Sequence, residues 1–401
     1  MELVRPAARW LRQAARANGA GSSGLSQLLG VHSLQSAGDA LVAVALAGTL
    51  FFSVPLGQAR GRVALYLVLT LLPFSFLVPI AGPLLDRLRH GRRNVLAATA
   101  GGRGLLTWVM AGAIAGLGLY PLALGVLVLA RAYGVARSAA TPRVRPEGMT
   151  LIQANARLNV AGTASSSVAA AMGGVVAKTL GASWVLYAAS FLLLAAGVLA
   201  VRLPAHVDEA PAAVDEERVS FRLRAAGPAV MAALGSAAAL RAVAGLLTIF
   251  LAFLLRAKHA SAWEIALVVG AAAVGQIGGT LGAARIRRVS ARAATRLSPL
   301  LALLACLAAA VRPHGVLPAV AAGVASFVAS MSKFGLDASL QTQVPSQSVS
   351  SAFAQSETAL QLTWVLGAAI ALVLPESGSV GFAVAAVLSA VGAVAALRVR
   401  R

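Results

Sequence analysis

The residues of this chain best suited to chemistry are single charges inside long apolar stretches. Asp39 follows a Ser-Ala-Gly sequence near the start of one stretch, and Arg103, Arg131 and Arg241 lie in others. An ionisable side chain inside a bilayer costs on the order of 2.5–3.5 kcal/mol, so it normally faces a cavity or a partner. A guanidinium group that approaches such a carboxyl group makes it release its proton. These residues are therefore expected to face a polar cavity or one another inside the membrane.

The composition explains why these charges stand out. Of the 401 residues, 59% are hydrophobic and 12% are charged, whereas about 25% of the residues of a soluble protein are charged. We therefore expect an all-α polytopic membrane protein, because a spanning helix needs about 20 apolar residues and satisfies its own backbone hydrogen bonds. The apolar runs predict twelve transmembrane helices, over residues 34–55, 62–81, 94–115, 117–138, 153–176, 181–201, 237–256, 263–284, 297–312, 315–337, 351–374 and 378–398.

The basic residues set the expected orientation. With the amino terminus in the cytoplasm, twenty-three arginines fall in inward-facing segments and only six basic residues in outward-facing ones. This asymmetry predicts a multi-pass protein of the inner (cytoplasmic) membrane with both termini in the cytoplasm. The net charge of +21 then reflects topology. We expect no nucleic-acid partner, because no basic stretch has interleaved aromatic residues.

A polar connector divides the chain into two halves. The expected parts are a cytoplasmic amphipathic segment (1–30), a first six-helix bundle (31–201), a cytoplasmic linker (202–227), a second six-helix bundle (228–398) and a cytoplasmic tail (399–401). The linker contains two acidic clusters and is typical of a solvated connection rather than of a site.

A short loop between the second and third predicted helices carries a recognisable pattern. Its sequence is GPLLDRLRHGRR over residues 82–93, with one acid among arginines. It resembles the G-x-x-x-D-R-x-G-R-R signature of the major facilitator superfamily, with two extra residues before the second glycine. The resemblance extends over roughly 31–398 and implies two pseudo-symmetric six-helix bundles that transport by alternating access.

An internal repeat agrees with this resemblance. Val144, followed ten residues later by Ala-Asn-Ala-Arg157, matches Val344, followed at the same spacing by Ala-Gln-Ser-Glu357. The offset is 200 residues, and the two elements open the fifth and eleventh predicted helices. Such a duplication is expected of transporters built from two related bundles.

The resemblance implies a conformational gate around the loop. In the family, the loop carboxylate, here Asp86, caps the start of the eleventh helix, whose free amide groups suit an anion; a solvated acid at a helix end is the alternative. Arg157 and Glu357 are expected either to close the cytoplasmic mouth together or to pair within their own halves. The expected gate residues are Gly82, Asp86, Arg87, Gly91, Arg92, Arg157, Glu357, Lys333 and Asp337.

The expected proton-coupling and cavity residues are Asp39, Arg131, Arg103, Arg241 and Gln276. The Ser-x-Gly-Asp sequence at Asp39 resembles the first helix of efflux members of the family, where an acid is linked to proton movement; a carboxylate at a helix start near headgroups is the alternative. Arg131 resembles the family's fourth-helix arginine, or else extends to the inner headgroups. Arg103 is expected to be structural, as a partner of Asp86 or Asp39.

The remaining polar residues receive simpler interpretations. Lys333 and Asp337, four residues apart on one predicted helix, are expected to neutralise each other. The five histidines are taken to lie in loops and termini and are given no role, and the single cysteine, Cys306, has no partner for a disulfide or metal site. No metal or other cofactor is expected.

The function implied is secondary active transport by a non-enzymatic, monomeric protein. The sequence lacks the G-x-x-x-x-G-K-[ST] loop of ATP-driven pumps. The resemblance is greatest to bacterial macrolide-type efflux members, which implies proton-coupled export of a hydrophobic or amphiphilic small molecule. A lipid or lysolipid flippase, an uptake permease and a non-transporting membrane scaffold are the alternatives.

Overall fold

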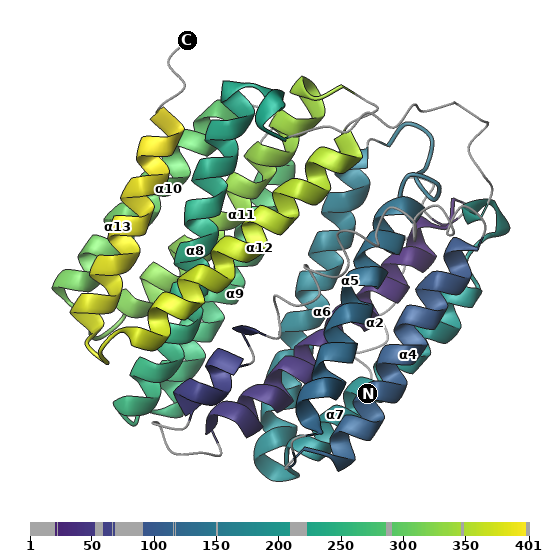
Figure 1. Cartoon of the computed structure of the whole chain (residues 1–401), viewed down its shortest axis with the longest axis horizontal. Helices are drawn as coiled ribbons and strands as arrows, with labels where there is room; N and C mark the ends of the chain where they lie inside the picture. The colour runs from purple at the N-terminus through teal and green to yellow at the C-terminus, as the bar shows by residue number, and fades with distance from the viewer. Residues whose placement is uncertain are drawn as a thin grey trace, which may run out of the picture. The chain divides into compact units, whose positions relative to one another are not determined.

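The computed structural model describes residues 21, 23–52, 59–65, 67–68, 91–114, 116, 118–149, 151–208, 223–285, 291–345 and 349–397. All regular structure in these segments is helical, as predicted (Figure 1). The long helices are α2 (Leu25–Leu46, continued by the π-helical turn η1, Ala47–Phe52), α4 (Arg92–Gly112), α5 (Leu119–Ala140), α6 (Leu151–Thr179), α7 (Ala182–Val201), α8 (Pro228–Ala257), α9 (Ala262–Arg285), α10 (Ala291–Val311), α11 (Leu317–Gln343), α12 (Val349–Val373) and α13 (Gly378–Leu397).

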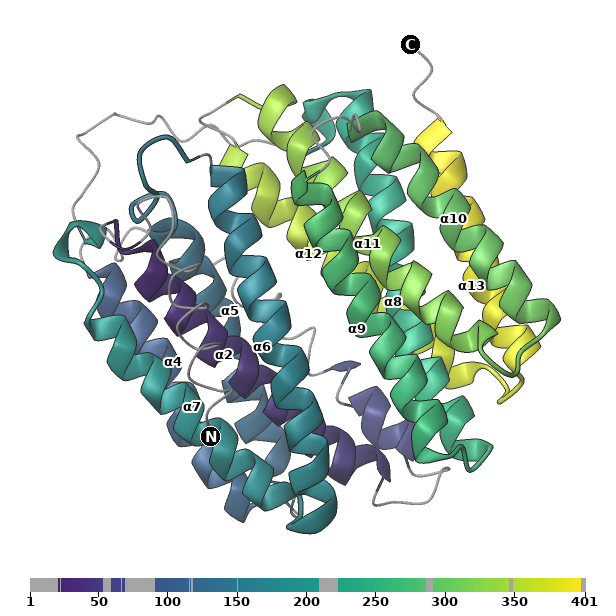
Figure 2. The ribbon, with the colours of Figure 1, turned by 180° about the vertical axis from the view of Figure 1, so that it is seen from behind.

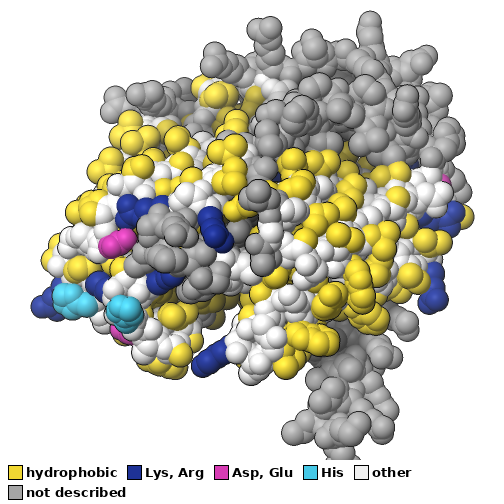
Figure 3. Space-filling view, turned by 60° about the horizontal axis from the view of Figure 1, so that its bottom comes forward, with side chains coloured by type: hydrophobic (Ala, Val, Ile, Leu, Met, Phe, Trp, Pro, Cys, Tyr) yellow, Lys and Arg dark blue, Asp and Glu magenta, His cyan; other side chains and the backbone are white. Residues whose placement is uncertain are grey.

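Most of these helices are suited to a bilayer. Ten of them are long and apolar enough to cross a membrane; α4, which carries Arg92, Arg93 and Arg103, is not among the ten. Large apolar side chains such as Phe191 and Leu304 are mostly exposed, and Figure 3 shows hydrophobic side chains spread over the visible face. A water-soluble protein does not expose apolar surface on this scale. The chain is therefore a multi-pass membrane protein.

The chain divides into two compact units, residues 1–214 and 215–401. In the first unit α2 packs against α6 and α7, and α4 packs against α5 and α7. In the second unit α8 packs against α12 and α13, and α10 packs against α11 and α13. The same pairs thus recur six helices further along the chain, although α8 also contacts α10 and α11. Figures 1 and 2 show these helices from opposite sides.

Three helix starts, and the end of α11 at Gln343 instead of 337, differ from the sequence prediction by six residues or more. The first helix begins at Leu25 rather than at residue 34, because its polar side chains face other helices and do not mark a membrane surface. Helix α8 begins at Pro228 rather than at residue 237 and is continuous to Ala257. The ninth predicted helix corresponds to α10 and begins at residue 291 rather than 297. The amphipathic segment 1–20 and the second predicted helix beyond residue 68 lie outside the described residues.

Glycines allow α8 and α12 to touch backbone to backbone. A Cβ on Gly245 of α8 would collide with the carbonyl group of Trp364, and one on Gly367 of α12 would collide with that of Ala242. Without a strong hydrophobic drive between helices in lipid, close packing through small residues holds such pairs together. Because the added Cβ would collide with backbone atoms, the clash could be relieved only if a whole helix moved.

We predict that Gly367→Ala destabilises the second unit by about 1–3 kcal/mol, the usual cost of overpacking. Gly270→Ala in α9 is the matched control, since a Cβ there meets nothing within 4 Å; it should leave stability unchanged or slightly raised. Thermal unfolding of purified protein in detergent measures both changes. Equal melting temperatures for the two variants would contradict the assigned contact.

Candidate functional site

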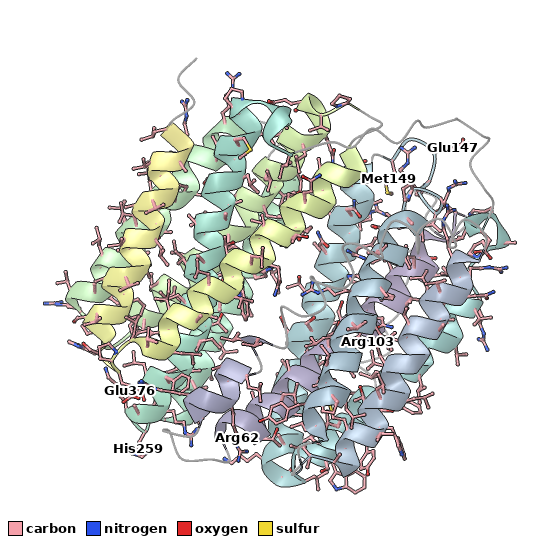
Figure 4. The ribbon with its side chains drawn as sticks, viewed as in Figure 1. Arg62, Arg103, Glu147, Met149, His259 and Glu376 are labelled. Atoms are coloured by element: carbon pink, nitrogen blue, oxygen red, sulfur yellow. The ribbon has the colours of Figure 1, made fainter. Side chains whose placement is uncertain are left out.

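The central feature of the first unit is an ion pair between α2 and α4. The Arg103 guanidinium of α4 pairs with the Asp39 carboxylate of α2. Its other terminal nitrogen, Nη1, donates to Gln35 Oε1 at 2.5 Å. Arg103 and Gln35 are each 1% exposed, whereas the Asp39 side chain is 51% exposed. Figure 4 shows Arg103 inside the N-terminal unit, among its helices. The cation is thus held in the protein interior, and the acid remains accessible.

Helix α7 positions both partners of this ion pair. Gly38 of α2 faces Leu193 of α7, and Gly104 of α4 faces Leu194, the next residue along α7. In both cases a Cβ on the glycine would lie within 3 Å of the leucine side chain. Each glycine is adjacent in sequence to a charged partner, so contact with one turn of α7 brings Asp39 and Arg103 to the same level.

These contacts decide between the sequence-based readings of Asp39. The residue lies fourteen positions after the first residue of α2. The reading of Asp39 as a carboxylate at a helix start is therefore wrong. Of the two partners considered for Arg103, the structure selects Asp39. Arg131, for which the sequence left two readings open, is half-buried in α5, and the arginine that pairs with Asp39 is Arg103.

Sequence reasoning missed two members of this region. His32 was taken to lie in a terminus, but it lies within α2 with Nε2 at 3.3 Å from Arg137 Nη1. Gln35 was overlooked, although it holds Arg103. A usable signal was present, because residues 32, 35 and 39 are spaced at three and four and share one helix face.

The second unit contains its own charged cluster, Lys333, Asp337 and Glu357. Lys333 Nζ of α11 lies 2.6 Å from Asp337 Oδ1 one turn along the same helix. It also lies 2.5 Å from Glu357 Oε1 of α12 and 5.9 Å from the centre of the Phe353 ring. The predicted pairing of Lys333 with Asp337 is confirmed, and Glu357 pairs within its own half, as one of the two sequence readings proposed.

The other predicted site residues lie outside these two charged clusters or outside the described residues. Arg241 of α8 lies within electrostatic range of Glu357. Gln276 is exposed on α9, where its carbonyl oxygen accepts a hydrogen bond from Thr280 at 2.8 Å. Arg157 is half-buried in α6. The gate residues Gly82, Asp86 and Arg87 lie outside the described residues. So do residues 346–348 of the segment 346–351 that Asp86 was expected to cap.

The described end of the loop pattern binds the segment after α7. Arg92 Nη1 donates to the Val207 carbonyl oxygen at 3.1 Å. The Asp208 carboxylate accepts from the Arg93 backbone N–H at 3.0 Å and from its Nε at 2.6 Å. Burial alone would raise the pKa of Asp208, but these hydrogen bonds and the charge of Arg93 outweigh it and lower that pKa below its ordinary value. Arg92 and Arg93 thus fasten the start of the linker to α4.

Few His, Cys, Asp and Glu side chains lie close together in the described part of the chain. No group of three or more His, Cys, Asp or Glu side chains there is placed to hold a metal ion. Cys306 is buried and unbonded. The features left for function are charge pairs inside membrane-spanning helices, which suit ion binding and conformational switching.

The spanning helices and the ion pairs among them define a helical multi-pass membrane protein with charged groups in its interior, and comparison with known proteins gives its family. The model of the Major Facilitator Superfamily matches residues 28–368. The chain belongs to this superfamily and is a transporter, not an enzyme.

The chain is also similar to two mycobacterial proteins and, in fold, to a solved structure. An uncharacterised protein of Mycobacterium leprae is 33% identical over 423 residues, covering 96% of this chain and 72% of that protein. A Mycobacterium tuberculosis protein is 33% identical over 418 residues, covering 95% and 75%. The fold is similar to the crystal structure of a bacterial homologue of the human lysosomal transporter Spinster, inward-facing and unoccupied. The TM-score is 0.65 at 16% identity, covering 96% of this chain and 99% of that one.

We predict that Asp208→Asn lowers thermal stability near neutral pH by up to about 1 kcal/mol, as for an exposed ion pair. The folded-state pKa of Asp208 is depressed, so its contribution is present above the unfolded value of about 4 and is lost as pH falls through the folded pKa. The variant and the wild type should therefore converge in acid. Glu147→Gln, in the exposed α5–α6 connection, is the control. A difference that persisted unchanged at low pH would contradict the assigned role of the carboxylate.

We predict that Lys333→Met destabilises the second unit by about 1–3 kcal/mol, because two carboxylates then lose their common partner. The triple variant Lys333→Met, Asp337→Asn, Glu357→Gln removes the uncompensated charges as well. It should recover most of the lost stability in the same thermal measurement. A triple variant no more stable than the single one would show that the ion pairs do not carry the effect.

Proposed function

We propose that this chain is a proton-coupled secondary transporter that exports a hydrophobic or amphiphilic small molecule. The observation that carries the proposal is the Asp39–Arg103–Gln35 arrangement. Placing charged side chains inside the membrane costs free energy, whereas apolar side chains could join the same helices without that cost. Its exposed carboxylate and buried cation are what a reversible proton carrier requires.

The coupling follows from the charge on Asp39. As a carboxylate it holds Arg103, and a proton on Asp39 abolishes the attraction between them. Arg103 then keeps only Gln35 as its described hydrogen-bond partner. One proton thereby shifts the equilibrium between two conformations that differ in helix packing. In alternating access, such a shift exposes the substrate site to the other side of the membrane.

The proposal includes the architecture and setting of the transporter. The two units are pseudo-symmetric six-helix bundles, which the recurrence of the same helix pairs in both units supports. Their boundaries are 31–201 and 228–398, with a cytoplasmic linker between them. The chain is a monomer of the inner membrane with both termini in the cytoplasm, an orientation supported by the arginine asymmetry of the sequence.

Gating is proposed for the charged groups near the helix ends. The loop residues Gly82, Asp86, Arg87, Gly91 and Arg92 are assigned the role of a conformational gate, which the resemblance of their sequence to the family signature implies. Within the second unit, the Lys333 cluster holds α11 to α12 in one conformation. This role is supported by the exposure of Glu357, whose side chain is 52% exposed and therefore free to change partner.

We predict that Asp39→Asn reduces transport driven by a pH gradient below about one tenth of the wild-type rate. Exchange of the same compound without a gradient should persist, because the variant keeps the shape of the side chain. The measurement is uptake into proteoliposomes with an imposed pH difference, over soluble dyes, antibiotics and a short-chain fluorescent lipid.

The control for this experiment is Glu376→Gln in the α12–α13 connection. Movement of the fluorescent lipid alone would identify a flippase, and movement in the direction of the proton gradient would identify an uptake permease. Gradient-driven transport unchanged in Asp39→Asn would refute the coupling role.

A further inference from the structure

The ion pair is one end of a longer row of polar groups. On α2, His32 and Gln35 precede Asp39 on the same face. On α5, the Tyr133 ring stacks on the His32 ring with centroids 6.3 Å apart and planes 12° apart. Arg137, one turn beyond Tyr133, contacts His32 at 3.3 Å. Tyr133 lies within electrostatic range of Arg137 and of Arg103, which closes the row back to Asp39.

Four atoms in this row are buried without a hydrogen-bond partner among the described residues: His32 Nδ1, Gln35 Nε2, Arg103 Nε and Tyr133 Oη. Gln35 and Arg103 are 1% exposed and Tyr133 is 5% exposed. Buried polar atoms in native proteins are bonded to protein or to ordered water. Because these atoms are hydrogen-bond donors and the Tyr133 hydroxyl can also accept, water, which both accepts and donates, is the ligand that suits them.

The contact with Arg137 fixes the chemical form of His32. A guanidinium group has donors only, so Arg137 must donate and His32 Nε2 must accept. A neutral imidazole with a free electron pair on Nε2 carries its hydrogen on Nδ1. The unpartnered Nδ1 is therefore an N–H donor within the buried row.

We propose that this row binds ordered water and carries protons between Asp39 and the cytoplasmic ends of α2 and α5, with His32 as the relay and Arg137 as its gate. The proposal rests on the proposed proton coupling through Asp39 and adds the path by which its proton reaches the cytoplasm. Histidine suits the task because it both accepts and donates a proton near neutral pH.

The transfer balances step by step. Asp39 gives its proton to a bound water, and the excess proton reaches Nδ1 of a His32 ring that carries its hydrogen on Nε2. With Arg137 withdrawn, the imidazolium releases the Nε2 proton toward the cytoplasm. Nε2 then accepts from Arg137, and the Asp39 carboxylate pairs with Arg103. The arrangement observed is the one that follows release. The ring is reset when it turns about its Cβ–Cγ bond, loses the Nδ1 hydrogen to water on the cytoplasmic side, gains one at Nε2 from the same water and turns back, so that no proton returns to Asp39.

The charged and titratable side chains that the structure describes around His32 are those of Arg137, Tyr133 and Arg103. Helix α5 contributes Arg137 and Tyr133, and α4 contributes Arg103 at the far end of the row. Where α6 meets this part of α2 it presents Gly162, on which a Cβ would lie 2.8 Å from His32 Nε2, and Ser166, which donates to the Ser36 carbonyl oxygen at 3.1 Å. Helix α7 meets α2 through apolar residues such as Leu193.

The first test determines the tautomer of His32 in the wild-type protein and needs no substrate. Nitrogen-15 NMR of histidine-labelled protein in lipid, with the His32 signal assigned by its loss in His32→Gln, distinguishes the two tautomers. We expect hydrogen on Nδ1 and magnetisation transfer from water to that N–H. Hydrogen on Nε2, or an Nδ1–H without contact to water, would overturn the proposal.

The second test follows the proton to Asp39. Right-side-out proteoliposomes containing a caged proton are flashed, and infrared spectroscopy records the carboxylic acid band that Asp39→Asn removes. His32→Gln should slow its appearance by about tenfold or more without changing its final size, and His259→Gln, in the α8–α9 connection, should match the wild type. An equal rate in His32→Gln refutes the relay. No Asp39 band between about pH 8 and about pH 4 refutes the proposed coupling itself.

Discussion

The placement of charge inside apolar helices governs the rest of this structure. A carboxylate and a guanidinium in a bilayer must find each other or a polar cavity, because neither is stable alone in hydrocarbon. The Asp39–Arg103 pair meets this requirement unevenly. Arg103 is enclosed and also bound to Gln35, while Asp39 keeps an exposed side. When the exposed Asp39 of such a pair is neutralised by a proton, the buried Arg103 still keeps its hydrogen bond to Gln35.

Small residues at the helix contacts allow the ion pair to form. Arg103 reaches Asp39 because two glycines allow α2 and α4 to meet adjacent leucines of α7. The second unit uses the same device for α8 and α12, where Gly245 and Gly367 allow backbone contact. Polar function and close packing are therefore linked, since each charged residue of the pair adjoins the glycine that positions it.

Sequence alone predicted the class of the protein, and tertiary contacts decided the site. Hydropathy and arginine placement located most helices, because lipid imposes length and polarity on each one separately. They failed at Leu25, where His32 and Gln35 face other helices and look like a membrane boundary. They also could not choose between Arg103 and Arg131 as the partner of Asp39, since that choice depends on how α2 and α4 pack on α7. Lys333 and Asp337 were predictable because their contact lies within one helix.

The central claim is that a proton gradient drives the cycle through Asp39. It is tested most directly by following concentrative transport in proteoliposomes while an ionophore collapses the pH difference at constant membrane potential. The account predicts that accumulation stops and the compound re-equilibrates as soon as the difference is gone. Accumulation that continues undiminished after the collapse would contradict it.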